Sequence, residues 1–249
     1  MSSLTVLGSS GAHPQADNPC SGYLLEHDGF SLVLDLGYGT AGPLLGHRPQ
    51  GNVDAVVITH EHADHCADLH ALMRIRLYGS PGAQKIPLYC TEGVVTRING
   101  LDTGEGLSQV FDIRPWPETV HIGPFRLTPF RLPHHVDNVG VRLSTPDFTF
   151  AYTGDTGPDP ALAELGRDAD LFLVEATHQG PSPSPETRNL LLTAGEAGRF
   201  AREAGARRLA LTHLWPGSDP GVSVTEAAAE YPGPILTPTA GDVIGLVSA

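Results

Sequence analysis

The stretch Thr59-His60-Glu61-His62-Ala63-Asp64-His65-Cys66 places three histidines and one aspartate within six consecutive positions. An apolar run, residues 53–58, comes directly before the first histidine and predicts a buried strand. Residues 67–78 carry apolar side chains at helical spacing, which predicts a helix. The polar cluster is therefore expected at the turn between a strand and a helix.

The side chains of this cluster are of the kinds that hold divalent cations. Histidine nitrogens and carboxylate oxygens, without a thiolate, suit zinc, and they also suit iron or manganese. His60 and His62 are two positions apart, so in an extended segment their side chains point the same way and can hold one ion. Asp64 and His65 then turn toward a neighbouring position as the helix begins. A polar loop with chance histidines is the alternative, and the density of such residues argues against it.

The cluster resembles the HxHxDH signature of the metallo-β-lactamase superfamily. In that family two metal ions share a site that is completed by an isolated histidine, a bridging aspartate and a histidine near the C-terminus. Three later segments are similar to the family's segments for these positions and come in the same order: residues 132–141, 152–156 and 209–214. The resemblance extends from about residue 4 to residue 247.

Each of the three segments supplies one candidate ligand. The first holds His134 and His135 and resembles the segment of ribonuclease Z-type proteins, in which the ligand lies six residues before a glycine. Gly140 therefore selects His134. Asp155 stands at the bridging position of the family's Gly-Asp-Thr turn, and His213 follows an apolar strand as the last histidine does.

The resemblance implies two divalent ions, with zinc preferred and manganese or iron as alternatives. It assigns His60, His62 and His134 to one ion, Asp64, His65 and His213 to the other, and Asp155 to a position between them. The implied reaction is hydrolysis by a hydroxide that bridges the two ions, and Asp64 would also orient that hydroxide.

The fold implied by the resemblance is an αββα sandwich, in which two mixed β-sheets are flanked by helices. Strands come first in hairpins and then alternate with helices in each half of the chain, and this order fits such a sandwich. Periodicity alone predicts only a mixed α/β protein. Because the candidate ligands run from His60 to His213, most of the chain is needed in one piece, and residues 1–249 are expected to form a single domain.

The individual elements are predicted from periodicity and turn residues. Strands are expected at residues 4–7, 21–26, 30–36, 86–90, 119–122, 125–132, 139–144, 148–152, 171–174 and 208–212, and near Ile235 and Val243. Helices are expected at residues 91–98, 159–165, 193–204 and 224–231, the third with Thr193 as its cap and Glu196 three residues later. Residues 99–116 have little periodicity and several glycines, which predicts a loop that could wall the active site.

The composition bears on partners and location. A formal net charge of −13 with only 15 basic residues favours a small-molecule substrate and disfavours a large nucleic acid, although a local basic patch would be compatible with an acidic average. No apolar stretch approaches the roughly 20 residues that span a bilayer. The N-terminus has no basic segment of the signal-peptide kind, so the cytoplasm is the expected location. A homodimer is compatible with the sequence, which leaves the oligomeric state open.

Two residues near the cluster have alternative interpretations. Cys66 adjoins the ligands, but a small apolar residue at the helix start is favoured over a thiolate ligand. Asp35 either supports a metal-binding histidine through a hydrogen bond or is a turn carboxylate, and the sequence leaves this choice open. The three cysteines are scattered, which argues against a disulfide framework.

Ligand identity separates branches of the superfamily. Zinc β-lactamases have a cysteine where Asp155 stands, and flavodiiron proteins have a glutamate where His62 stands, so both activities are disfavoured. In ribonuclease Z an arm that grips tRNA is inserted between the third motif and the Gly-Asp-Thr turn, whereas residues 134–155 leave room only for a hairpin. Those nucleases also have a histidine where this chain has Leu191, and that histidine is thought to protonate the leaving group. His178 is the candidate replacement, with a plain loop histidine as its alternative.

These observations predict a dinuclear metal-dependent hydrolase that acts as a phosphodiesterase on a small phosphodiester or nucleotide. An acyl hydrolase acting on a lactone or thioester is the alternative, because a metal can hold the leaving oxygen without an acid. A ribonuclease Z-like nuclease without the tRNA-binding arm is a further alternative. A non-enzymatic metal-binding protein is disfavoured, because all seven ligand positions are intact.

Overall fold

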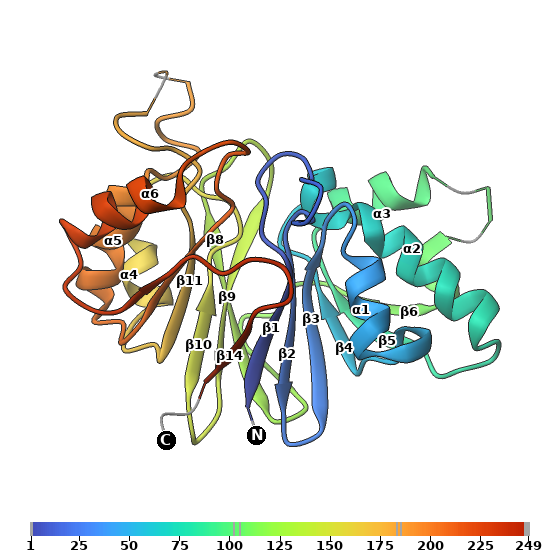
Figure 1. Ribbon diagram of the computed structural model, residues 1–249. Coiled ribbons are helices and arrows are strands. Elements are labelled where there is room, and N and C mark those ends of the chain that lie inside the picture. The colour runs from blue at the N-terminus through green and yellow to red at the C-terminus, as the bar shows by residue number, and fades with distance from the viewer. Residues whose placement is uncertain (1, 102, 105, 183, 185, 247–249) are drawn as a thin grey trace.

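The strands form two mixed β-sheets that pack face to face (Figure 1). The computed structural model describes residues 2–101, 103–104, 106–182, 184 and 186–246. Within these residues each sheet has seven strands. The first sheet has the order β14 (Val243–Gly245), β1 (Ser3–Gly8), β2 (Gly22–His27), β3 (Phe30–Leu36), β4 (Ala55–Val57), β5 (Ile86–Tyr89) and β6 (Phe111–Arg114). The second has the order β13 (Ile235–Leu236), β12 (Leu209–Thr212), β11 (Leu171–Glu175), β10 (Thr149–Tyr152), β9 (Asn138–Ser144), β8 (Phe125–Leu132) and β7 (Val120–Ile122).

Helices cover the outer face of each sheet (Figure 1). The first sheet carries α1 (Ala41–His47), α2 (Ala63–Gly79) and α3 (Glu92–Asn99), with short 3₁₀ turns at Pro49–Gly51 and Gly106–Gln109. The second carries α4 (Ala161–Leu165), α5 (Ala194–Ala204) and α6 (Pro220–Ala228). The predicted αββα sandwich is therefore confirmed. No helix in the described part of the chain combines the length and the apolar character needed to cross a membrane.

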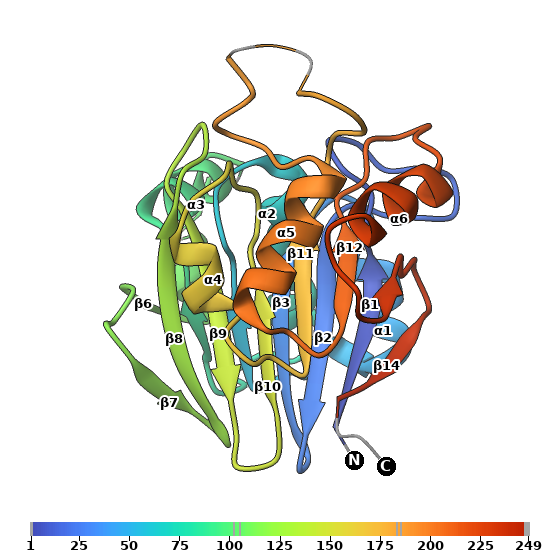
Figure 2. The ribbon, with the colours of Figure 1, turned by 90° about the vertical axis from the view of Figure 1, so that its left-hand side faces the viewer.

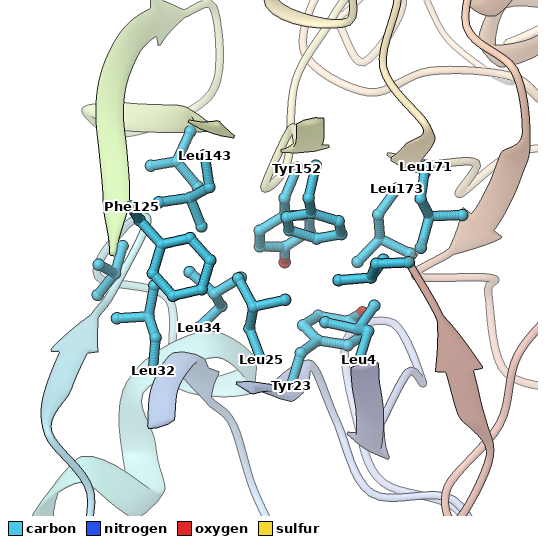
Figure 3. Close-up of a cluster of buried hydrophobic side chains, with 14 of the residues drawn as sticks. Leu4, Tyr23, Leu25, Leu32, Leu34, Phe125, Leu143, Tyr152, Leu171 and Leu173 are labelled. Atoms are coloured by element: carbon cyan, nitrogen blue, oxygen red, sulfur yellow. The ribbon is translucent and has the colours of Figure 1, made fainter. Parts of the chain in front are cut away.

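The core has three layers because the central strands are buried on both faces. Side chains such as Tyr23, Leu25, Leu34 and Tyr152 fill the space between the sheets (Figure 3). The alternate residues of the same strands pack outward against the helices, Leu24 being one of them. Strands buried on both faces read as continuous apolar runs, and this is why the sequence of these strands shows little alternation.

The arrangement of strands brings the candidate ligands to one end of the sandwich. β3, β4, β5 and β6 are mutually parallel, and so are β10, β11, β12 and β13. The carboxyl ends of these strands lie at the end opposite the two chain termini (Figure 1). The loops that follow the strands therefore converge there.

Two predicted elements were wrong in detail. Residues 99–116 are not wholly a loop, because Phe111–Arg114 forms β6, which pairs with β5; residues 102 and 105 lie outside the described residues. The alternation of apolar and charged residues in β6 is only four residues long, and parallel pairing with a distant strand provides most of its hydrogen bonds. The last helix begins at Pro220 rather than at residue 224, because the Asp219 side chain caps it by accepting a hydrogen bond from the Gly221 backbone.

The predicted cap of α5 is confirmed and provides a test of local stability. The Thr193 hydroxyl accepts a hydrogen bond from the Glu196 backbone, and the Glu196 side chain accepts one from the Thr193 backbone. Thr193→Ala should lower the free energy of unfolding by about 1 kcal/mol, because it leaves a helix N–H group without its partner. Urea unfolding would measure the change. Thr225→Ala, on the exposed face of α6, is the control and should leave stability nearly unchanged.

Candidate metal centre

The candidate ligands come from five segments that meet at the carboxyl ends of the parallel strands. His60 and His62 lie in the turn after β4, and Asp64 and His65 lie in the first turn of α2. The other three follow later strands: His134 after β8, Asp155 after β10 and His213 after β12. Residues 60–65 follow a strand of the first sheet, and the other ligands follow strands of the second sheet. The site therefore lies where the ends of the two sheets meet.

The structure brings these side chains into two groups that could each hold one cation. One group comprises His60, His62, His134 and Asp155, and the other comprises Asp64, His65, Asp155 and His213. Within each group the candidate ligand atoms lie within 4.8 Å of one another. Asp155 belongs to both groups, so its carboxylate could contact a cation held by either one.

The nitrogen and oxygen atoms of the two groups are placed to bind cations, because they cannot all form hydrogen bonds with one another. Nδ1 of His62 lies 3.1 Å from Nε2 of His134 and 3.2 Å from Nε2 of His60. Nε2 of His65 lies 3.2 Å from Oδ1 of Asp155, yet neither atom makes a hydrogen bond within the described residues. A buried polar atom without a partner costs roughly 1–3 kcal/mol. Divalent cations between these nitrogen and oxygen atoms would satisfy all of them.

The electrostatics separates the two groups. Burial lowers the pKa of His60 well below its usual value and lowers that of His134 to about 4, so both imidazoles are neutral and keep a lone pair for a cation. Burial alone would also lower the pKa of His65, but the carboxylates of Asp155 and Asp35 outweigh it and raise the pKa. Burial would raise the pKa of Asp155, but the surrounding histidines, His213 first, hold it well below its usual value. The shared carboxylate is therefore ionised.

Asp35 orients the ligands of the first sheet. Its side chain is fully buried and accepts hydrogen bonds from His65 Nδ1 at 2.8 Å, from the Tyr152 hydroxyl at 2.8 Å and from the Thr59 hydroxyl at 2.9 Å. Because the Thr59 hydroxyl donates to Asp35, it accepts from His60 Nδ1 at 3.0 Å. Nε2 of both histidines is thereby left for a cation, so Asp35 is a supporting carboxylate and not a simple turn residue.

A second carboxylate orients His213 in the same way. The Thr177 hydroxyl donates to Glu175 at 2.6 Å and therefore accepts from His213 Nδ1 at 2.9 Å. Burial raises the pKa of Glu175 to about 8, so near neutral pH its side chain holds a proton, and its Oε2 can still accept the hydrogen bond from the Thr177 hydroxyl. His134 Nδ1 donates to the Leu190 carbonyl at 2.8 Å. Each of these histidines thus has one nitrogen fixed by the protein and the other directed into the site.

Sequence reasoning missed most of these supporting residues. Tyr152 lies on an inward-facing position of β10, but its contact with Asp35 joins residues 117 positions apart. Glu175 does give a signal, as a lone carboxylate that ends the apolar strand β11. Thr59 and Thr177 are small polar residues next to histidines, and nothing in the sequence distinguishes them from loop threonines.

Four other residues singled out in the sequence lie outside both groups. His135 is exposed, and its ring centroid lies 6.3 Å from that of His62. His178 is half-buried, and its Nε2 has no hydrogen-bond partner within the described residues. Leu191 is 9% exposed. Cys66 packs in the outer core, and its thiol points to the Glu61 carbonyl, as expected for a small apolar residue at a helix start.

The segment between His134 and Asp155 has the predicted size. β9 and β10 form an antiparallel hairpin, with Asn138 at its start and Tyr152 at its end. No further element intervenes between these two strands. An inserted arm of the ribonuclease Z kind is therefore absent from this part of the chain, all of which the structure describes.

Comparisons with known proteins agree with this geometry. Residues 32–214 match the model of the beta-lactamase superfamily domain. An uncharacterized protein of Mycobacterium leprae, ML1173, is 37% identical over 98% of this chain and 88% of its own length. The probable metallo-hydrolase YhfI of Bacillus subtilis is 31% identical over 85% of this chain and 86% of its own length. A ribonuclease Z of Myxococcus xanthus is also 31% identical, over 93% of this chain and 94% of its own length.

Solved structures extend the similarity to the whole fold. The crystal structure of YhfI has a TM-score of 0.87 at 27% identity and covers 98% of this chain and 100% of its own. A diphosphatase of the PhnP family shares the fold, with a TM-score of 0.77 at 19% identity over 98% of both chains. The family model covers most of the chain, and the ligand-type residues meet where the fold requires them. The chain therefore belongs to the metallo-β-lactamase superfamily and is a metallo-hydrolase of that superfamily.

Proposed function

We propose that the chain is a dinuclear phosphodiesterase that cleaves a small phosphodiester or nucleotide. The observation that carries this proposal is the pair of ligand groups that share Asp155. The name ribonuclease Z of one relative and the name diphosphatase of one structural neighbour both refer to phosphate esters or anhydrides, and they support the reaction class. Zinc is the preferred metal, with manganese or iron as alternatives.

Each of the two ligand groups would hold one metal ion. His60, His62, His134 and Asp155 would hold one ion, and Asp64, His65, His213 and Asp155 would hold the other. When bound, such a pair of ions lowers the pKa of a water molecule toward neutrality and polarises a substrate oxygen.

Asp64 is suited to orient the attacking water. Its Oδ2 accepts a hydrogen bond from the Ala12 backbone at 2.9 Å and lies 3.2 Å from Nε2 of His213, so both of these atoms could contact the same cation. Burial would raise the pKa of Asp64, but the neighbouring His213 and His65 outweigh it and lower the pKa. Asp64 is thus ionised, and its Oδ2 is held by the protein. Its Oδ1 accepts no hydrogen bond within the described residues.

The acid that protonates the leaving group is assigned to His178. Leu191 cannot transfer a proton, and His178 is next to Thr177, which contacts His213. Nε2 of His178 has no hydrogen-bond partner within the described residues, which leaves it available for a proton, whereas burial lowers the pKa of His178 and so disfavours the protonated form. A surface histidine without a role is the alternative.

An acyl hydrolase acting on a lactone or thioester is the second candidate, and the apolar side chain at Leu191 favours it. A nuclease acting on tRNA is disfavoured by the short β9–β10 hairpin. We expect residues 1–249 to form one domain. We expect its substrate to be a small molecule, and we expect no membrane partner. A cytoplasmic location and a homodimeric state are further predictions from the sequence.

Assays of the metal-loaded protein on three substrates would test the reaction class. Bis(p-nitrophenyl) phosphate should be hydrolysed, whereas a simple lactone and a β-lactam should be poor substrates. Activity should rise with added zinc or manganese until about two ions are bound per chain, because the ligands exceed those that one ion needs. Elemental analysis would count the ions. Faster turnover of the lactone, or full activity with a single ion, would contradict the proposal.

Two adjacent histidines provide a matched test of the ligand assignment. His134→Ala should lose much of the bound metal, because it removes a nitrogen from the first group, whereas His135→Ala should keep it. Elemental analysis of both variants, purified side by side without chelator, makes the comparison. Greater metal loss from His135→Ala would show that the ligand register in this turn is wrong.

The role of His178 can be separated from metal binding by the choice of leaving group. His178→Ala should lower turnover of an alkyl phosphodiester about a hundred- to ten-thousand-fold, because a general acid contributes that much, and should spare p-nitrophenyl esters. Steady-state rates on both classes of ester would show the difference. Equal rates of variant and native protein on both classes would leave His178 without a catalytic role.

A further inference from the structure

A groove lies beside the candidate metal centre at the open edge of the sandwich. It consists of two cavities of about 480 and 380 Å³, and Trp116 and Arg131 line both of them. β6 and β7 are edge strands of the two sheets and lie on the same side of the sandwich (Figure 2). We call this space the Trp116 groove; the residues that matter for its chemistry are Thr91, Glu92, Arg114, Trp116, Arg131 and Asp137.

The Trp116 groove adjoins the segments that carry the metal ligands. Asp137 lies in the same turn as His134, between β8 and β9. Glu92 begins α3, next to Gly93, where an added Cβ would lie only 1.2 Å from Oε2 of Glu61. Glu61 itself stands between His60 and His62. A substrate whose scissile bond lies at the ions can therefore extend into the groove.

Among the described residues, the lining of the groove carries one unpaired cation, Arg131, and more carboxylates than guanidinium groups. Arg131 is exposed, and its side chain makes no ion pair or hydrogen bond within the residues that the structure describes. Arg114 is already paired with Asp112 at 2.7 Å, and the carboxylates of Glu92 and Asp137 also line the groove. A polynucleotide needs a track of several cations along its backbone. The groove fits a single nucleotide-sized group better than a strand.

Trp116 gives the groove a flat apolar wall. Its indole packs against the core between the sheets, and its ring centroid lies 6.5 Å from that of Tyr89, so the ring is held in place. Its Nε1 has no acceptor within the described residues, and neither does the hydroxyl of Thr91, a residue that is 7% exposed. Both of these atoms are buried, so the groove offers a ligand the face of the indole and not its N–H group, and a heteroaromatic ring would cover that face.

We propose that the Trp116 groove binds the nucleobase of a nucleotide phosphodiester, held between the indole of Trp116 and the guanidinium of Arg131. Guanidinium groups both stack on bases and donate to the acceptor atoms on their edges. The carboxylates of Glu92 and Asp137 would accept hydrogen bonds from sugar hydroxyls or base amino groups. This inference rests on the proposed phosphodiesterase activity and adds the substrate class.

Base binding can be measured without turnover. The chain has two tryptophans, so Trp215→Phe leaves Trp116 as the single indole emitter. Thymidine 5′-monophosphate should quench this emission, whereas ribose 5-phosphate, which lacks a base, should not. Arg131→Ala should weaken the nucleotide about 10- to 100-fold, as expected for loss of a charged donor. Arg126→Ala is the control, because Arg126 is also exposed but lies five residues away on the same strand, about 17 Å.

Two esters with the same leaving group separate this inference from the proposed function. The p-nitrophenyl ester of thymidine 5′-phosphate and methyl p-nitrophenyl phosphate differ only in the nucleoside. Arg131→Ala should lower kcat/KM about 10- to 100-fold for the nucleoside ester alone. Equal effects on both esters, or no response of Trp116 to the nucleotide, would overturn the groove assignment while the phosphodiesterase stands. Turnover of neither ester by the metal-loaded protein would overturn the proposed function, and quenching of Trp116 would then decide the groove by itself.

Discussion

The structure depends on burying four imidazoles and the carboxylate of Asp155 against one another at the carboxyl ends of the strands. His60, His65 and His213 are almost fully buried, and His134 is nearly so. Nε2 of His60 and Nε2 of His134 each lie within about hydrogen-bond distance of Nδ1 of His62, and Nε2 of His65 has no hydrogen-bond partner within the described residues. Burying polar atoms without partners is unfavourable, and cations bound between these atoms would supply the missing partners. The parallel strands, the short turns and the helices outside all serve to deliver these side chains to that point.

Support for the site comes from the core between the sheets. Asp35 connects His65 and Thr59 of the first sheet to Tyr152 of the second, and its backbone is held at a φ of 55°, a region that non-glycine residues rarely adopt. Glu175 supports His213 through Thr177 in the second sheet. Each sheet thus has a carboxylate, a threonine and a histidine in series. A change in how the sheets pack would alter the contact between Tyr152 and Asp35 and so the orientation of the ligands.

The surroundings of the centre narrow the range of substrates. The β9–β10 hairpin leaves no arm for a large RNA, and the Trp116 groove carries a single free guanidinium beside a flat aromatic wall. Both features suit a compact substrate. Leu191 is apolar and cannot supply a proton. Under the proposed reaction the leaving group would therefore be stable as an anion, be held by a metal ion, or receive its proton from another residue such as His178.

The sequence by itself determined the elements whose causes are local. The spacing of His60, His62, Asp64 and His65 predicts the turn and its ligands, and the pair Thr193 and Glu196 predicts the cap of α5, because both depend on residues a few positions apart. The αββα fold and the roles of His134, Asp155 and His213 followed from the resemblance to a family. Only the tertiary structure placed β6 beside β5, joined Tyr152 to Asp35 and brought Arg131 and Trp116 to the same groove. These contacts join residues far apart in the chain, and no local pattern encodes a partner that only sheet order and packing bring into reach.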